Sequence, residues 1–182
     1  IKRFGASVES IAEAHTCLKQ EGLASLQIIF NIFRQKPIAA LFDQAKAKRV
    51  SLIIRLPLAS GLLGGSLHPG ISFPKNDHRL FNSDGQCFNV GETFAGIPFN
   101  TGLSLVEELK TLVPKGMNLT QMALRWILDF DAVTVVIPGS KSPNQVPENV
   151  SASQSPSLSK SLHAKLNVFY NEKIIQHIRG KY

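Results

Sequence analysis

The residue types best suited to chemistry lie in Ile137–Asn149, which follows the apolar run Val133–Val136. The apolar run predicts a buried strand, and Pro138-Gly139 predicts a tight turn after it. Ser142-Pro143 suits the start of a helix, because Ser can cap the first turn and Pro lacks an N–H that has no partner there. Free N–H groups, the helix dipole and Lys141 would then converge on one spot that could hold a phosphate. The alternative, a strand–helix turn that binds nothing, stays open.

Composition and charge exclude several classes of protein. The chain has 182 residues, of which 43% are hydrophobic and 18% charged, as is typical of one folded domain rather than a disordered chain. The net charge is +7 and the pI is about 9.6. Lys and Arg are scattered, which favours a polyanionic cofactor or substrate over nucleic acid. No apolar stretch approaches the roughly 18 residues of a membrane span, and we expect a cytoplasmic protein.

The cysteines and histidines argue against disulfide and metal sites. Cys17 and Cys87 are far apart and form no CxxC pair. The histidines are dispersed along the chain, so no metal site is expected. The chain begins at Ile1-Lys2-Arg3 without an initiator Met, and we therefore expect it to be part of a longer protein.

Hydrophobic periodicity and turn residues predict strands that alternate with helices. We expect, in order, a strand at 1–6, a helix at 11–20, a strand at 23–33, a helix at 37–48, a strand at 50–56, a long functional loop at 67–99, helices at 102–112 and 118–130, a strand at 133–137 with a helix to about 150, a linker at 151–159 and an amphipathic helix at 162–179. Residues 1–182 would form a single partial domain, with 151–182 as a linker and a C-terminal helix that packs on the barrel.

This order of elements predicts an α/β fold with a parallel sheet and right-handed crossovers. Four strand–helix units correspond to half of a (β/α)8 TIM barrel, in which ligands bind on the loops that follow the strands. Each segment singled out here as special comes directly after a predicted strand. We therefore expect the functional site at the carboxyl ends of about four parallel strands, with the long loop on that side.

Four motifs occur in a distinctive order: GASVES at 5–10, LQIIFN at 26–31, PLASGLLGG at 57–65 and ALRWILDFDAVTVVIPGSK at 123–141. Together they resemble the C-terminal half of the barrel in the aldo-keto reductase superfamily, most closely its bacterial-type and potassium-channel-β-like branches. The resemblance covers essentially the whole chain. It implies a nicotinamide cofactor, usually NADPH, that lies across the barrel mouth without a Rossmann motif and transfers hydride to a small-molecule carbonyl substrate.

The resemblance assigns the nicotinamide end of the cofactor to three residues. Ser7 and Gln27 would hydrogen-bond the carboxamide, which both donates and accepts. Gln27 could instead be a polar strand residue satisfied inside the barrel. Arg55 stands where many relatives carry an aromatic residue, and its guanidinium plane could stack on the nicotinamide ring. The alternative for Arg55 is an ion pair with an internal carboxylate.

The phosphates and the adenosine are assigned in the same way. The pyrophosphate cradle would be Pro57, Leu58, Ala59, Ser60 and Gly61, whose small residues let backbone N–H groups approach closely. Arg79 would add a cation from a loop that folds over the cofactor. The 2′-phosphate would face Gly139, Lys141 and Gln145, and the adenine would face Glu148 and Asn149. A cation at Lys141 favours NADP over NAD.

No catalytic residue is assigned by position. The family uses a Tyr acid with Lys, Asp and His from the first half of the barrel, whereas the tyrosines here are Tyr170 and Tyr182, near the end of the sequence. Asp129 and Asp131 precede the last strand and are expected to be structural. The fragment alone would have little reductase activity, and its unpaired strand edges favour self-association. Two alternatives stay open: a non-catalytic NADP-binding regulatory module related to channel β subunits, and a phosphate-binding barrel of another class.

Overall fold

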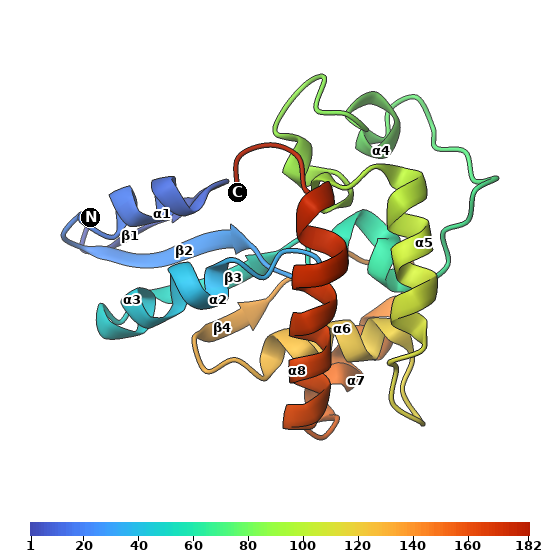
Figure 1. Ribbon diagram of the computed structural model, residues 1–182. Helices are drawn as coiled ribbons and strands as arrows, with labels where there is room; N and C mark the ends of the chain where they lie inside the picture. Colours follow the sequence, from blue (N-terminus) through green and yellow to red (C-terminus); the bar gives the residue numbers. More distant parts are fainter.

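A computed structural model describes residues 1–182. Its centre is a sheet of four parallel strands in the order β1-β2-β3-β4 (Figure 1). The strands are β1 (Phe4–Ser7), β2 (Leu23–Ile29), β3 (Ser51–Arg55) and β4 (Val133–Val136). The prediction of about four parallel strands that alternate with helices is confirmed. Strands β1 and β4 each pair on one side only, and the predicted self-association through these edges stays a prediction.

The end of β2 differs from the sequence prediction. A strand was expected to continue to residue 33, but β2 ends at Ile29 and the chain turns so that Asn31 forms an isolated bridge with Arg34. The Asn31 side chain holds this turn: its Oδ1 accepts the N–H of Phe33 at 2.9 Å. The apolar run misled the prediction because Phe33 is fully buried outside the strand, and a short buried apolar run does not distinguish a strand from other buried segments.

The first three helices cover one flank of the sheet in Figure 1. They are α1 (Ile11–Cys17), α2 (Pro37–Ala40) and α3 (Phe42–Ala47). The Ser10 side chain caps α1 by accepting the N–H of Glu13. A continuous helix was expected from 37 to 48, but the chain breaks at Leu41, where φ is −136°. Leu41 is fully buried, so the break places an apolar side chain into the core.

The remaining helices pack around the other end of the sheet (Figure 1). They are α4 (His78–Phe81), α5 (Phe99–Lys110), α6 (Leu119–Leu128), α7 (Gln145–Gln154) and α8 (Lys160–Phe169). Helix α6 begins after Asn118, where a helix start was expected, and Asn118 and Gln121 form a reciprocal capping box. Helix α7 runs four residues into the stretch expected to be a linker, and one of those residues, Ala152, is buried.

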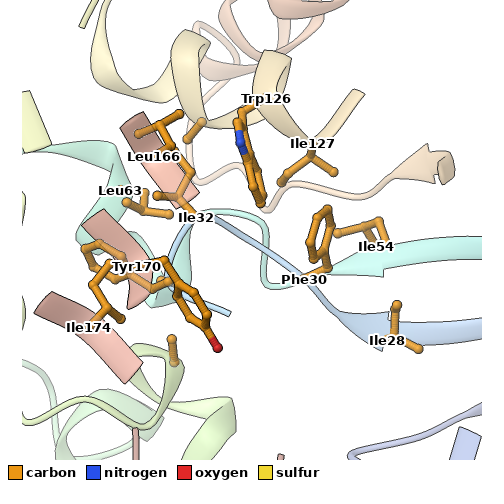
Figure 2. Packing of buried hydrophobic residues seen from close by; sticks show 14 of the residues in the cluster. Ile28, Phe30, Ile32, Ile54, Leu63, Trp126, Ile127, Leu166, Tyr170 and Ile174 are labelled. Atoms are coloured by element: carbon orange, nitrogen blue, oxygen red, sulfur yellow. The ribbon is translucent and has the colours of Figure 1, made fainter. Parts of the chain in front are cut away.

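Aromatic side chains join the sheet to the helices. The ring of Phe30, just after β2, lies 4.9 Å from those of Phe42 and Trp126, and Trp126 lies 5.0 Å from Phe130. Figure 2 shows Phe30 beside Ile54 of β3. These ring pairs bury large apolar surfaces; Phe30–Phe42 and Trp126–Phe130 meet edge to face, and Phe30 and Trp126 are tilted by 30°. They place the β2 end, α3 and α6 at fixed positions relative to one another.

A buried carboxylate ties the C-terminal helix to α6. Asp129 accepts hydrogen bonds from Arg125 in α6, from the N–H of Leu158 and from His163 in α8, each at 2.9 Å. Asp129 is therefore structural, as expected from the sequence. Beyond α8 the chain continues as a π-helical turn, η4 (Tyr170–Ile174), and a 3-10 turn, η5 (Ile175–His177). The expected helix at 162–179 is thus confirmed in position but not in regularity.

The segment at 67–99 is mostly irregular, as predicted, with α4 and the short turns η2 (Val90–Glu92) and η3 (Phe94–Gly96) inside it. Its fold depends on Asn82, which is fully buried. The Asn82 amide donates to Thr93 Oγ1 at 3.1 Å, and its carbonyl oxygen accepts the N–H groups of Cys87 and Phe88 at 2.9 Å. One buried amide thus ties the end of α4 to residues 87, 88 and 93.

Candidate functional site

The residues with candidate roles come from the carboxyl ends of the strands and from the long loop that packs against them. Ser7 and Gln27 are neighbours across the first strand pair, in register with Ile53 of β3. The Gln27 amide donates to Ser7 Oγ at 3.2 Å. Two polar side chains that can donate and accept therefore lie together on one face of the sheet, as the resemblance implies.

Arg55, the last residue of β3, is held by a carboxylate from the long loop. Its Nη1 donates to Glu92 Oε2 at 2.5 Å, and its Nη2 donates to the carbonyl oxygen of Val8 at 3.4 Å. Both side chains of the ion pair are largely buried. This is the second of the two roles considered for Arg55, the ion pair with an internal carboxylate. The Nε of Arg55 is buried without a partner.

The turn after β3 has a strained backbone. Leu56, Ala59 and Ser60 have φ between 48° and 57°, a left-handed conformation that non-glycine residues rarely adopt, and Gly61 follows with φ 99°. Such strain persists only where the surrounding contacts enforce it, and it clusters at ligand sites. The enforcing contacts include a hydrogen bond from the Asn31 amide to the carbonyl oxygen of Leu56 at 2.8 Å.

Ser60 ties this turn to the long loop. Its hydroxyl donates to the carbonyl oxygen of Glu92 at 3.0 Å and accepts the N–H of Phe94 at 3.1 Å. His78 Nε2 lies 3.4 Å from the same hydroxyl. Within the predicted cradle, Pro57 to Gly61, Ser60 is therefore hydrogen-bonded to residues 92 and 94.

A second carboxylate, Asp77, joins two of the predicted phosphate-binding cations. Arg79 donates from Nε and Nη2 to the two carboxylate oxygens at 2.9 and 2.6 Å, and Lys141 Nζ lies 4.0 Å from Oδ2. Hydrogen bonds from Arg79 hold the pKa of the Asp77 carboxyl far below its usual range. The Nη1 group of Arg79 faces Gly61, 3.7 Å from where a Cβ there would lie. Arg79, Lys141 and the strained turn thus meet in space.

Arg79 is also fixed by an aromatic face. Its Cζ lies 4.3 Å from the ring centre of Phe73, and its side chain is 14% exposed. Lys141, by contrast, is 79% exposed and free to move. One cation of the pair is therefore preorganised and the other can swing towards a ligand.

The β4–α7 connection departs from the prediction made for it. Helix α7 begins at Gln145, with Asn144 at the cap position and no side-chain cap, so the expected start at Ser142 is wrong. The Gln145 side-chain oxygen accepts the N–H groups of Lys141 and Ser142 at 2.6 and 3.3 Å. The free N–H groups expected there consequently have a partner in this structure. The Gln145 side chain competes for them because it can reach back one turn.

The other residues of this connection lie as follows. Gly139 is uncrowded: no atom lies within 4 Å of the position that a Cβ would take there. The Asn149 amide donates to Ser140 Oγ at 3.0 Å, and Glu148 accepts from the amide of Asn118 at 2.8 Å. Their assignment to the 2′-phosphate and the adenine stays a prediction, as do the cofactor roles of the other named residues.

Sequence reasoning missed Asp77 and Glu92, the two carboxylates that organise the site. Both lie in a stretch without periodicity, so the only signal was the presence of acidic residues in a loop expected to approach Arg55 and Lys141. The structure brings together no group of three or more His, Cys, Asp or Glu side chains that could hold a metal ion. None of its helices is both long and apolar enough to span a membrane.

Comparison with known proteins gives one consistent family. The model of the aldo/keto reductase family matches residues 1–171. The aldo-keto reductase YhdN of Bacillus subtilis is 26% identical over 148 residues, which cover 80% of this chain and 42% of that protein. The aldo-keto reductase str7 of Strobilurus tenacellus is 30% identical over 151 residues, 80% of this chain and 41% of that protein. The L-glyceraldehyde 3-phosphate reductase of Escherichia coli K12 is 33% identical over 114 residues, 63% of this chain and 32% of that protein.

Solved structures agree in fold. The glycerol dehydrogenase AKR11B4 of Gluconobacter oxydans is similar with a TM-score of 0.71 and 22% identity, over 99% of this chain and 52% of that chain. The holo form of the aldo-keto reductase AKR11C1 of Bacillus halodurans is similar with a TM-score of 0.65 and 21% identity, over 93% of this chain and 50% of that chain. The chain thus spans about half of these (β/α)8 barrels, and the predicted half-barrel is confirmed.

Proposed function

The chain belongs to the aldo/keto reductase family, and on this premise we propose that it is the C-terminal, cofactor-binding part of an NADP-dependent reductase of small carbonyl compounds. The observation that carries the proposal is the meeting of Arg79 and Lys141 beside the strained turn that ends at Gly61. Two cations from separate loops next to a glycine-containing turn form a site suited to phosphate groups.

The residues present fit an extended dinucleotide. Ser7 and Gln27 supply donors and acceptors for a carboxamide at the carboxyl ends of β1 and β2. The turn at 57–61 and Arg79 would hold the pyrophosphate, and Lys141 would contact the 2′-phosphate. The nicotinamide would supply the hydride that reduces the carbonyl group. The chain's own residues bind and orient the cofactor, and Asp77 keeps Arg79 in place by two hydrogen bonds.

Glu92 and Arg55 would shape the inner end of the site. Their ion pair links the long loop to β3 above Val8. A nicotinamide ring placed against the Arg55 guanidinium plane would leave the hydrogen bonds in that plane intact. The loop at 67–99 would then close on the cofactor without breaking the Arg55–Glu92 pair.

The proposal is tested by fluorescence titration of this chain with NADPH and with NADH, beside a Lys141→Ala variant. Saturable binding of NADPH is expected, and the variant should weaken it about threefold to tenfold, because one exposed charge-assisted contact contributes on the order of 1 kcal/mol. NADH binding should change little, since it lacks the 2′-phosphate. Lys115→Ala, which removes an exposed lysine without an ion pair, is the matched control. Equal NADPH affinity in the wild type and Lys141→Ala would contradict the assignment.

A non-catalytic NADP-binding role is the second candidate. The two tyrosines of the chain are bonded to each other, because the Tyr170 hydroxyl donates to Tyr182 Oη at 3.1 Å. NADPH binding without carbonyl reduction in the full-length gene product would favour this role over the reductase.

A further inference from the structure

Arg179, in the segment that follows η5, joins two distant points of the long loop. Its Nη1 donates to Asp84 Oδ1 at 2.6 Å, and its Nη2 donates to the carbonyl oxygen of Ser83 at 3.1 Å. Its Nε and its backbone N–H both donate to the carbonyl oxygen of Gly96, at 2.9 and 3.2 Å. One residue thus ties together the two ends of the stretch 83–96, because the guanidinium presents several donors in a fixed fork.

Two glycines allow this segment to approach the loop closely. At Gly96, where φ is 81°, a Cβ would lie 2.8 Å from the carbonyl oxygen of Arg179. At Gly180, where φ is also 81°, a Cβ would lie 2.7 Å from Val90 Cγ1 and 3.3 Å from Asn89 Oδ1. Glycine alone combines this backbone conformation with so little space. Residues 179 and 180 are therefore packed directly on the loop, at residues 89, 90 and 96.

The stretch that Arg179 closes carries Glu92, in η2. The carboxylate of Glu92 accepts a hydrogen bond from Arg55, and its carbonyl oxygen accepts one from the Ser60 hydroxyl at 3.0 Å. The same turn rests on Arg34, because a Cβ at Gly91 would overlap the Arg34 guanidinium. The short turn η2 therefore connects residues 179 and 180 to the carboxyl end of β3.

We propose that Arg179 and Gly180 are positioning residues, which hold η2 so that Glu92 keeps the Arg55 guanidinium in place for the nicotinamide end of the cofactor. This inference rests on the proposed cofactor role. The two residues act through the loop, since the bonds of Arg179 go to residues 83, 84 and 96 rather than to Arg55. Both lie beyond residues 1–171, which the family model matches, so membership of the family does not imply this contact.

The alternative is that Arg179 forms only a surface ion pair with Asp84. The two side chains are 34% and 64% exposed, and ion pairs with such exposure contribute little to stability. The bonds to two main-chain carbonyl oxygens do not depend on Asp84, so Asp84→Asn should behave as the wild type. Arg179→Lys keeps the charge but loses the fork of donors, and it should behave as Arg179→Ala.

The first experiment compares two ligands, NADPH by fluorescence titration and adenosine 2′,5′-bisphosphate, which has no nicotinamide, by calorimetric titration. Arg179→Ala should raise the Kd for NADPH about threefold to tenfold and change that for the bisphosphate by less than about twofold, because a displaced η2 lowers the fraction of molecules that can hold the nicotinamide end. Arg3→Ala, which removes an exposed arginine, is the control and should change neither. Equal weakening of both ligands, or of neither, would overturn the positioning role.

The second experiment, hydrogen exchange of the ligand-free chain, separates failure of this inference from failure of the proposed function. In Arg179→Ala the amides of Glu92, Thr93 and Phe94 should exchange about tenfold faster than in the wild type, whereas those of α6 should keep their rates. Unchanged exchange at these three amides would overturn the inference whether or not NADPH binds. Faster exchange in a protein whose wild type binds no NADPH would support the hold on η2 but refute the proposed function, and with it the cofactor part of this inference.

Gly180→Ala is a second variant that keeps the test decisive if Arg179→Ala fails to fold. It leaves the bonds of Arg179 available but places a Cβ against Val90. The amides of 92–94 should again exchange faster and NADPH should bind more weakly, with the bisphosphate little affected. Wild-type exchange and wild-type NADPH affinity in Gly180→Ala would contradict the role given to this contact.

Discussion

Asn31 offers a sharp test of how the turn after β2 supports the candidate site. Its side chain is fully buried and makes two hydrogen bonds, one from Nδ2 to the carbonyl oxygen of Leu56 and one from the N–H of Phe33 to Oδ1. Asn31→Ala leaves that carbonyl and that N–H unpaired. Each unpaired buried group costs about 1 to 3 kcal/mol. Because Leu56 is only half-buried, water can reach it, and we expect a total loss of about 2 to 4 kcal/mol in the free energy of unfolding.

Urea unfolding followed by circular dichroism measures this loss as a fall in the midpoint concentration at an unchanged slope. The matched control is Asn100→Ala, an exposed asparagine in α5 without side-chain hydrogen bonds, which should change stability by less than about 0.5 kcal/mol. Asn31→Asp keeps the acceptor for Phe33 but loses the donor to Leu56 and buries a charge, so it should not rescue stability. If Asn31→Ala destabilised the protein no more than Asn100→Ala, the role given to this side chain would be refuted.

Three further predictions concern the core and its buried polar groups. Burial alone would raise the pKa of Asp129, but the hydrogen bond from His163 and its other partners lower it overall. Its stabilisation is therefore complete above the unfolded pKa of about 3.9 and is lost as pH falls through the lower folded pKa. As pH falls below about 4, Asp129→Asn should lose less stability than the wild type; equal acid sensitivity would contradict this. Trp126→Ala should cost about 3 to 5 kcal/mol in urea unfolding, because it removes the ring that packs on Phe30; a loss below about 1 kcal/mol would show that the core repacks. Gly91→Ala should lower Tm, because a Cβ there would overlap the Arg34 guanidinium; an unchanged Tm would mean that Arg34 has room to move.

Local signals in the sequence were sufficient for the elements that depend on short-range interactions. Asn118 and Gln121 form the capping box of α6 because both partners lie within one helical turn. The alternation of β-branched and apolar runs with helical patterns predicted the four parallel strands. The motifs at 5–10, 26–31, 57–65 and 123–141 were enough to identify the family that the comparisons later gave.

Sequence reasoning failed where side chains compete for the same backbone groups. Ser142 and Pro143 have the residue types of a helix start, yet Gln145 takes the N–H groups of Lys141 and Ser142, and the helix begins two residues later than expected. The apolar run after Ile29 was assigned to a strand because burial by helices and burial by strands leave the same pattern in a short window. Both errors lie at element ends, where several local structures are close in energy.

The sequence by itself determined the half-barrel and its order of elements, because these follow from periodicity and from short motifs, and it predicted which cations would bind a dinucleotide. Only the tertiary structure decided how those cations are used. Asp77 holds Arg79, Glu92 holds Arg55, and Arg34 is buried without an ion pair. The pairing of Arg55 with Glu92 joins residues that are 37 positions apart, and the burial of Arg34 depends on Lys181 and Tyr182 at the far end of the chain. Such partners are chosen by the path of the irregular 67–99 segment and of the C-terminal turns, and no local propensity encodes that path.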